Sequence, residues 1–245
     1  MTSAWGTTET SPLATSAHML IERAGVIGVP VPGVDVKLVP TGNKLELRVR
    51  GPNIAPGYWR RPDLAEAMFD DEGFYKPGDA VRFADVSDPA KGLVFDGRTA
   101  EDFKLLNGTW VAVGALRVGA QATASPVMFD AIVTGEGRDC VGLVVWLNAA
   151  GCKHVTGEDG DLAAYARHPK VHAHLRKAFA DWNKVNTGAT MRVARLLLLS
   201  DVPSIDANEI TDKGYINQRV ALENRRAEVE RLFEGPSHPD IVVIE

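Results

Sequence analysis

One pattern restricts the fold more than any other: two short runs of alternating apolar and polar residues stand back to back. The runs are VDVKLVP (residues 34–40) and KLELRVRG (residues 44–51), and the triplet TGN joins them. Alternation with a period of two is typical of a strand with one buried face, and a short turn between two such runs indicates a hairpin. We therefore expect a β-hairpin here, half exposed to water.

The neighbouring residues continue this β-rich pattern as far as Arg98. The stretches GFYKPGDAVRFAD and GLVFDGR are predicted as two more strands, which flank a loop at residues 86–91. Before them, RRPDLAEAMF is predicted as a short helix, because Pro62 stands near its start and Asp63 falls in its first turn. Residues 26–98 should thus be mostly antiparallel β.

The pattern changes after Arg98, where strands and helices alternate. Two apolar strands are predicted around a Gly-rich turn, followed by two helices separated at Pro169, a buried strand and a long charged helix that starts at Tyr215. The stretch DGRTAED (residues 96–102) is the expected boundary. The predicted fold class is α+β, with a β-rich unit over residues 1–98 and a compact α+β unit over residues 99–245.

Charge and cysteine content restrict the class of function. The chain has 27 Lys and Arg residues against 32 Asp and Glu residues, a net charge of −5. It therefore lacks the basic excess that would favour binding to nucleic acid or to an anionic membrane. Two cysteines, Cys140 and Cys152, cannot build a disulfide framework and suit a reducing compartment. No secretory signal and no apolar run of about 18 residues is visible, and we expect a cytoplasmic protein.

The stretch AWGTTETSP (residues 4–12) collects groups that suit a nucleotide. Its threonines and serine carry hydroxyls, Gly6 allows close backbone approach, and Glu9 offers the hard oxygen that Mg²⁺ prefers. Trp5 adds a flat face on which a base could stack. The alternative is an ordinary Ser/Thr-rich loop or helix cap, which such runs commonly form.

Three later stretches add candidate side chains. Asp79 follows a glycine after an aromatic strand, where its carboxylate could accept hydrogen bonds from both hydroxyls of a ribose. Arg98 follows Gly97, and Lys213 lies in a polar loop before the last helix. Each feature alone is common, and only their combination indicates a site.

Together and in this order, the stretches resemble the adenylate-forming superfamily of acyl-CoA synthetases and aryl-CoA ligases. The signature Tyr/Trp-Gly-x-Thr-Glu appears at residues 5–9, and Tyr-x-Thr-Gly-Asp appears at residues 75–79 with Pro77 in place of Thr. The Gly-Arg…Lys…Gly segment runs over residues 97–108. Within the superfamily, residues 94–118 and the run EITDKGYINQR look most like the feruloyl-CoA synthetase branch.

The resemblance implies a reaction and a role for each residue. A carboxylate attacks the α-phosphate of ATP to give an acyl-adenylate, and the CoA thiol then displaces AMP to form a thioester. The substrate would be a feruloyl- or hydroxycinnamate-like acid, and the ligands would be ATP, Mg²⁺ and CoA. The implied roles are Mg²⁺ ligand for Glu9, α-phosphate contact for Thr8 beside Gly6, adenine contact for Trp5, ribose contacts for Asp79 and Arg98, and catalytic cation in the first half-reaction for Lys213.

The chain departs from the family in two places and in extent. The hinge position is Ala100 where the family commonly has Asp or Lys, and the loop around Lys213 lacks the usual sequence of that motif.

The resemblance also makes residues 1–98 the C-terminal part of the large AMP-binding domain and residues 99–245 the small mobile C-terminal domain. A phosphate-binding loop would precede the chain, so we expect the chain alone to be incomplete and inactive. The alternative is a split or truncated, non-catalytic piece that binds nucleotide or CoA or complements a missing N-terminal half.

Overall fold

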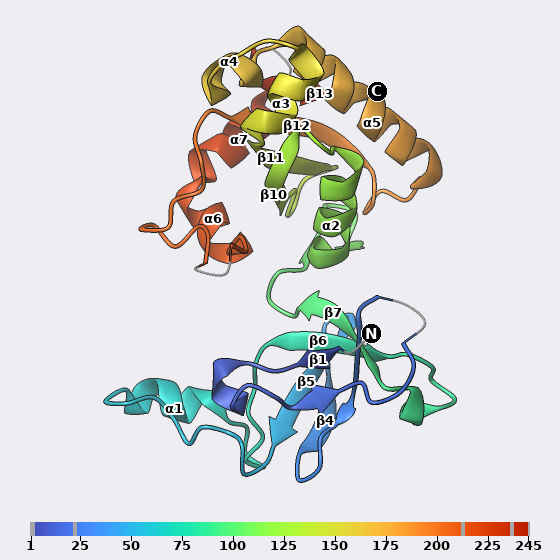
Figure 1. The fold of residues 1–245 in the computed structure, drawn as a ribbon, viewed down its shortest axis with the longest axis vertical. Helices are drawn as coiled ribbons and strands as arrows, with labels where there is room; N and C mark the ends of the chain where they lie inside the picture. Colours follow the sequence, from blue (N-terminus) through green and yellow to red (C-terminus); the bar gives the residue numbers. More distant parts are fainter. Residues whose placement is uncertain (1–2, 22–23, 212–213, 236–237, 245) are drawn as a thin grey trace. The chain divides into compact units, whose positions relative to one another are not determined.

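The computed structural model describes residues 3–21, 24–211, 214–235 and 238–244 (Figure 1). The chain divides into two compact units, Met1–Ala100 and Glu101–Glu245. Each unit has its own hydrophobic core, and each is described here by itself. The predicted α+β fold class is confirmed, with an antiparallel sheet in the first unit and mixed strands and helices in the second.

The first unit is built on a seven-stranded sheet in which every paired strand is antiparallel. In sheet order the strands are β1 (Ala4–Trp5), β2 (Thr15–Ser16), β3 (Val26–Pro30), β7 (Leu93–Arg98), β6 (Asp79–Phe83), β5 (Lys44–Arg50) and β4 (Asp35–Thr41). One helix, α1 (Pro62–Met68), begins at the predicted proline and adds Met68 to the core. Strands far apart in sequence, β3 and β7, are neighbours, so the sheet joins the start of the unit to its end.

The predicted hairpin is β4 and β5, and one of its faces differs from expectation. Thr41 pairs with Lys44 across a two-residue turn in which Gly42 has φ 61°, a conformation that glycine adopts without strain. The apolar face carries the buried Leu47 and Val49. The polar face is less exposed than expected because charged side chains pack on one another, and Glu46 on it is buried.

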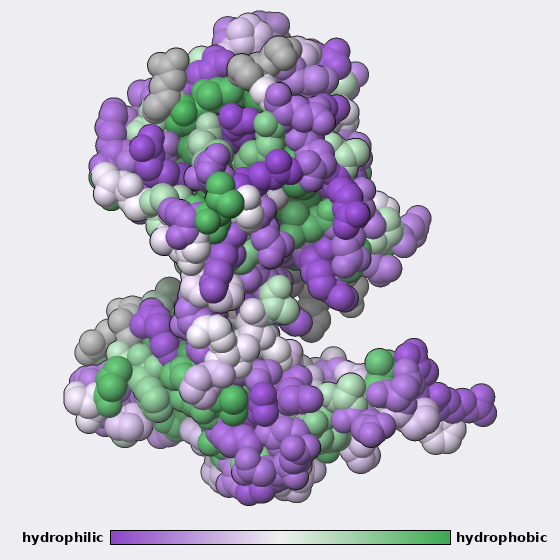
Figure 2. Space-filling view, turned by 180° about the vertical axis from the view of Figure 1, so that it is seen from behind, coloured by the Kyte–Doolittle hydropathy of each residue, from purple (hydrophilic) through white to green (hydrophobic). Residues whose placement is uncertain are grey.

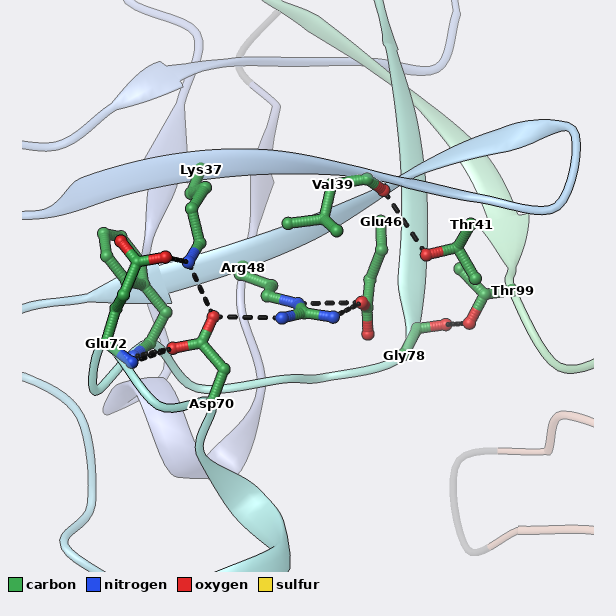
Figure 3. Close-up of polar contacts among 10 residues, drawn as sticks. Lys37, Val39, Thr41, Glu46, Arg48, Asp70, Glu72, Gly78 and Thr99 are labelled. Atoms are coloured by element: carbon green, nitrogen blue, oxygen red, sulfur yellow. Dashed lines mark hydrogen bonds and ion pairs between the residues drawn. The ribbon is translucent and has the colours of Figure 1, made fainter.

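These charges form a connected network (Figure 3). Arg48 donates to Glu46 (2.8 Å) and to Asp70 (3.0 Å), and Lys37 Nζ lies 2.7 Å from Asp70 and 2.8 Å from Glu72. The hydrogen bond from Lys37 holds the pKa of the Asp70 carboxyl well below its usual range. The network explains how a polar strand face can be covered without leaving charges unpaired.

The second unit centres on a four-stranded sheet in the order β10 (Met128–Thr134), β11 (Val141–Leu147), β12 (Val193–Leu199) and β13 (Ile241–Val243). The β11–β12 pair is parallel and the outer pairs are antiparallel. Every residue of β11 is buried, because helices cover both faces of the sheet. A short ribbon, β8 (Phe103–Lys104) and β9 (Trp110–Val111), precedes the sheet.

The helices fall into two groups, one on each face. On one face lie α2 (Val113–Thr123), α3 (Ala149–Thr156), α4 (Leu162–Ala166) and α5 (Pro169–Val185), and on the other lie α6 (Gln218–Asn224) and α7 (Arg226–Glu234). Strands β10, β11 and β12 and helices α4 and α5 match the sequence prediction, but β8, β9, α3 and β13 were not anticipated. On the face drawn in Figure 2 the outward side chains are mostly hydrophilic. In the described residues no helix has the length and apolar character needed to cross a membrane.

One sequence expectation for this unit is wrong. The single long charged helix from Tyr215 is two helices, and the first begins at Gln218, where the side chain of Asn217 caps it. The helices meet at Arg225, whose φ of −100° and ψ of 26° lie outside helical values. Its guanidinium instead reaches Glu209 and Asp201, and we attribute the break to these contacts.

Candidate functional site

The loop over residues 6–14 is closed by its own backbone. β1 pairs with β2, and the amide of Ala14 donates to the carbonyl of Trp5 over 3.0 Å. A Cβ on Gly6 would lie 1.6 Å from the carbonyl oxygen of Pro12, so only glycine fits where the two arms of the loop approach. The expected close backbone approach at Gly6 therefore exists, and the backbone it meets belongs to the chain itself.

The hydroxyl-rich stretch divides into structural and exposed groups. Thr10 is fully buried and its Oγ1 accepts from the amide of Thr7 (2.8 Å) and donates to the carbonyl of Thr7 (3.0 Å). Thr10 thus does what the helix-cap alternative expected. Thr8 is exposed and Glu9 half-buried, both in the short 3₁₀ helix η1 (Thr8–Thr10). These two side chains remain available to a ligand.

Trp5, Asp79 and Arg98 meet in space. Asp79 and Arg98 are register partners on β6 and β7, and Arg98 Nε lies 3.4 Å from Asp79 Oδ1. The indole Nε1 of Trp5 donates to Asp79 Oδ2 over 2.9 Å, a bond between residues 74 apart in sequence. Three residues picked from separate stretches, on β1, β6 and β7, therefore form one cluster.

The carboxylate in this cluster, that of Asp79, is buried. Asp79 is only 6% exposed, and burial raises the pKa of its carboxyl, an effect that Trp5 and Arg98 only partly offset. Its second oxygen, Oδ1, is buried and accepts no hydrogen bond from the described residues. A buried acceptor without a donor is costly, and hydroxyl donors from a ligand would satisfy it. Arg98 lies beside it, with a side chain that is 59% exposed.

Glu9 has a partner that sequence reasoning missed. Tyr58 donates its hydroxyl to Glu9 Oε1 over 2.6 Å, and the bond raises the pKa of Tyr58 to about 12. Burial would raise the pKa of the Glu9 carboxyl, but the bond from Tyr58 and the nearby hydroxyls of Thr7 and Tyr75 outweigh it, so this pKa lies below its usual value. Glu9 is therefore ionised at neutral pH. No local signal marks Tyr58, which is 49 residues from Glu9.

Two predicted residues remain, Ala100 and Lys213. Ala100 is exposed and ends the first compact unit. Lys213 falls outside the described residues. Among its described neighbours, the amide of Gly214 donates to the carbonyl of Thr211 (2.9 Å), and the amide of Thr211 donates to the carbonyl of Tyr215 (2.8 Å). The roles of Ala100 and Lys213 stay predictions.

Glu9 is the predicted metal ligand. Within the described residues no three His, Cys, Asp or Glu side chains gather as a metal site. Mg²⁺ commonly takes one or two protein carboxylates and fills its other positions with water and substrate phosphates. An ionised, half-buried Glu9 on a loop with exposed Thr8 fits that arrangement.

Comparisons with known proteins show which enzymes this chain is similar to. Residues 1–59 match the family of AMP-binding enzymes. A chloroplastic long-chain-fatty-acid–[acyl-carrier-protein] ligase of Arabidopsis thaliana is 24% identical over 94% of this chain and 32% of its own length. A long-chain-fatty-acid–CoA ligase of Mycobacterium bovis is 26% identical over 94% of this chain and 37% of its own length. The chain thus spans about a third of these relatives.

A solved structure supports the fold. The A domain of a carboxylic acid reductase from Segniliparus rugosus, in complex with AMP and a co-purified carboxylic acid, superposes with a TM-score of 0.71. It is 21% identical, over 95% of this chain and 35% of that one. At this identity the match shows the fold alone, shared with about a third of that adenylation domain's chain.

Proposed function

We propose, from the relation of this chain to the adenylate-forming AMP-binding enzymes, that its protein is an ATP-dependent acid–CoA ligase. A carboxylate would attack the α-phosphate of ATP, releasing pyrophosphate and forming an acyl-adenylate. The thiol of CoA would then attack the acyl carbon, forming the thioester and releasing AMP. The observation that carries the proposal is the Trp5–Asp79–Arg98 cluster, because three separately placed motif residues are in contact.

The cluster would hold the nucleoside. Asp79 Oδ1, buried and without a hydrogen-bond donor, would accept from the ribose hydroxyls, and the exposed Arg98 would close over the sugar. Trp5 would line the adenine while its Nε1 keeps Asp79 Oδ2 in place. Because Trp5 occupies one carboxylate oxygen, the other is presented in one orientation only.

The loop that carries Thr8 and Glu9 would face the phosphates. The Thr8 hydroxyl would donate to the α-phosphate, with Gly6 allowing the tight loop that presents it. Glu9 would hold Mg²⁺, which when bound supplies positive charge against the phosphate oxygens. Keeping Glu9 ionised is the contribution of its hydroxyl neighbours.

The second unit would supply the mobile part. Lys213 would neutralise charge on the phosphoryl group in the adenylation step, where a preorganised cation helps most. Rotation about the segment at Ala100 would then carry Lys213 away for the thioester step. Under this proposal residues 1–98 complete an AMP-binding domain and residues 99–245 are its mobile C-terminal domain.

The acid is proposed to be feruloyl- or hydroxycinnamate-like, on the resemblance of residues 94–118 and the run EITDKGYINQR. The two relatives described above act by name on long-chain fatty acids, which makes a fatty acid the competing substrate. The test is thioester formation by the full-length protein with ATP, Mg²⁺, CoA and either ferulate or palmitate. Product with ferulate alone supports the aromatic acid, product with palmitate alone replaces it, and product with neither refutes the ligase proposal.

A second candidate is a non-catalytic piece that binds nucleotide or CoA. It is favoured because the chain spans only about a third of the length of the relatives described above. Pyrophosphate release by residues 1–245 alone distinguishes the two. We expect no useful rate, because the chain spans only about a third of these relatives' length. Turnover above about 1 s⁻¹, within the usual enzyme range, would show that residues 1–245 suffice.

A further inference from the structure

The segment over residues 53–58 is fastened to the loop that carries Glu9. The amide of Ala55 donates to the carbonyl of Glu9 over 2.8 Å, and Asn53 Nδ2 donates to the carbonyls of Thr10 (3.0 Å) and Leu13 (2.7 Å). Ser11 Oγ donates in return to the carbonyl of Asn53 over 2.9 Å. We call residues 53–58 the bracket. It fixes the backbone of Glu9 from outside the loop.

The bracket ends in Tyr58, the residue that reaches the Glu9 side chain. Its hydroxyl donates to Glu9 Oε1 over 2.6 Å, a bond between side chains 49 residues apart in sequence. Tyr58 itself is held by a tight turn: the amide of Arg61 donates to its carbonyl over 3.1 Å, and Arg60 has φ 56°. An arginine in the left-handed region costs about 1 kcal/mol, and such strain gathers at functional sites.

We propose that Tyr58 is a positioning residue for the metal ligand Glu9. The inference rests on the proposed function, which makes Glu9 the Mg²⁺ ligand. By hydrogen-bonding Oε1, Tyr58 restricts how the Glu9 carboxylate can rotate, and so would help to fix the orientation in which this carboxylate is offered to a cation. Mg²⁺ demands near-ideal octahedral geometry, so a carboxylate locked in one orientation binds it better than one that swings. Hydrogen-bonding partners of metal ligands commonly contribute 10–100-fold in metal affinity.

The bonds from the bracket separate two effects. The backbone of Glu9 is held by Ala55, so removing the Tyr58 hydroxyl should release the side chain without opening the loop. Tyr58 is 41% exposed, so the hydroxyl that Tyr58→Phe removes does not belong to the buried core. A loss of metal affinity without a loss of stability is therefore the expected signature.

The experiment measures Mn²⁺, as a paramagnetic substitute for Mg²⁺, binding to the full-length protein saturated with a non-hydrolysable ATP analogue. The variants are Tyr58→Phe, Glu9→Gln and the matched control Tyr165→Phe, which also loses one hydroxyl bond, from Tyr165 to the carbonyl of Glu158 (2.8 Å) in the second unit. Thermal unfolding of each variant is recorded alongside. We expect Tyr58→Phe to weaken Mn²⁺ binding about tenfold or more, with an unfolding temperature like that of the parent, and Tyr165→Phe to bind Mn²⁺ normally.

The other outcomes show whether the positioning role fails alone or together with the assignment of Glu9 as the metal ligand. If Glu9→Gln weakens Mn²⁺ binding strongly but Tyr58→Phe matches the Tyr165→Phe control, the positioning role is overturned and the proposed function stands. If Glu9→Gln has no effect on Mn²⁺ binding, Glu9 is not the ligand and both ideas about this carboxylate are overturned. If Tyr58→Phe weakens Mn²⁺ binding but also unfolds at a clearly lower temperature than the parent, the hydroxyl is structural only, and the positioning role is again overturned.

Discussion

The ion pair between Arg225 and Glu209 gives a prediction that can be worked through quantitatively. Arg225 donates through Nε (2.6 Å) and Nη2 (2.8 Å) to the two carboxylate oxygens of Glu209, which is only 2% exposed. Ser204 adds its amide at 2.9 Å, and Asp201 lies 2.7 Å from Arg225 Nη1. The pair thus ties the loop after β12 to the junction of α6 and α7.

Replacing Arg225 with methionine keeps the apolar part of the side chain. It removes both hydrogen bonds that the guanidinium donates to Glu209. A buried carboxylate left without its cation typically costs about 3–5 kcal/mol. For a domain of this size each kcal/mol shifts the melting temperature by about 2–4 °C, so the second unit should melt roughly 10 °C lower. The neighbouring Arg226 is exposed, and Arg226→Met should stay within about 0.5 kcal/mol of the parent.

The cost should depend on pH in a definite direction. The bond from Arg225 lowers the pKa of the Glu209 carboxyl, so the pair stabilises the fold above the unfolded carboxyl pKa of about 4.3. This contribution is lost as pH falls through the lower folded pKa. Urea unfolding of parent and variants at pH 7 and pH 3 measures it. Equal costs for Arg225→Met and Arg226→Met at pH 7 would refute the reasoning, as would a larger cost for Arg225→Met at pH 3.

Three further predictions concern the candidate site. In urea unfolding at pH 7, Asp79→Asn should be at least as stable as the parent, because burial raises the pKa of Asp79 and disfavours its charged form. Any gain in stability of the variant over the parent should vanish below about pH 4. Gly6→Ala should destabilise the first unit by about 1–3 kcal/mol in the same assay, since the new Cβ would lie 1.6 Å from the oxygen of Pro12. Lys213→Ala in the full-length protein should slow adenylation about 10²–10³-fold and leave thioester formation from supplied acyl-adenylate nearly unchanged; equal slowing of both steps in single-turnover kinetics removes Lys213 from the mechanism.

Local patterns predicted the parts of the fold that are decided locally. The hairpin of β4 and β5 follows from alternation and a glycine turn, and α1 follows from Pro62 at its first position. The helix break at Arg225 could not be predicted in this way, because the run QRVALENRRAEVERLFE is helix-forming throughout. The break depends on Glu209 and Asp201, which only the tertiary fold brings to Arg225.

The same division holds for the candidate site. Motif residues Trp5, Asp79 and Arg98 were found from their local context and the family resemblance. The bond from Trp5 to Asp79 joins two strands, β1 and β6, that have three strands between them in the sheet order, so it depends on the tertiary fold. Tyr58 has no motif of its own in the sequence, and its contact with Glu9 depends on the bracket. Contacts across long sequence separations are the part that sequence patterns leave open.

The most direct test of the account is whether Asp79 recognises a ribose. Calorimetry would compare AMP with 2′,3′-dideoxy-AMP binding to the full-length protein and to its Asp79→Asn variant. A hydrogen bond to a charged group contributes about 1.5–3 kcal/mol, so the parent should prefer AMP by about 10–100-fold. Asp79→Asn should bind both nucleotides with similar, weaker affinity. A parent that binds the two equally, or a variant that keeps the full preference for AMP, would contradict the assignment of this cluster as the nucleoside site.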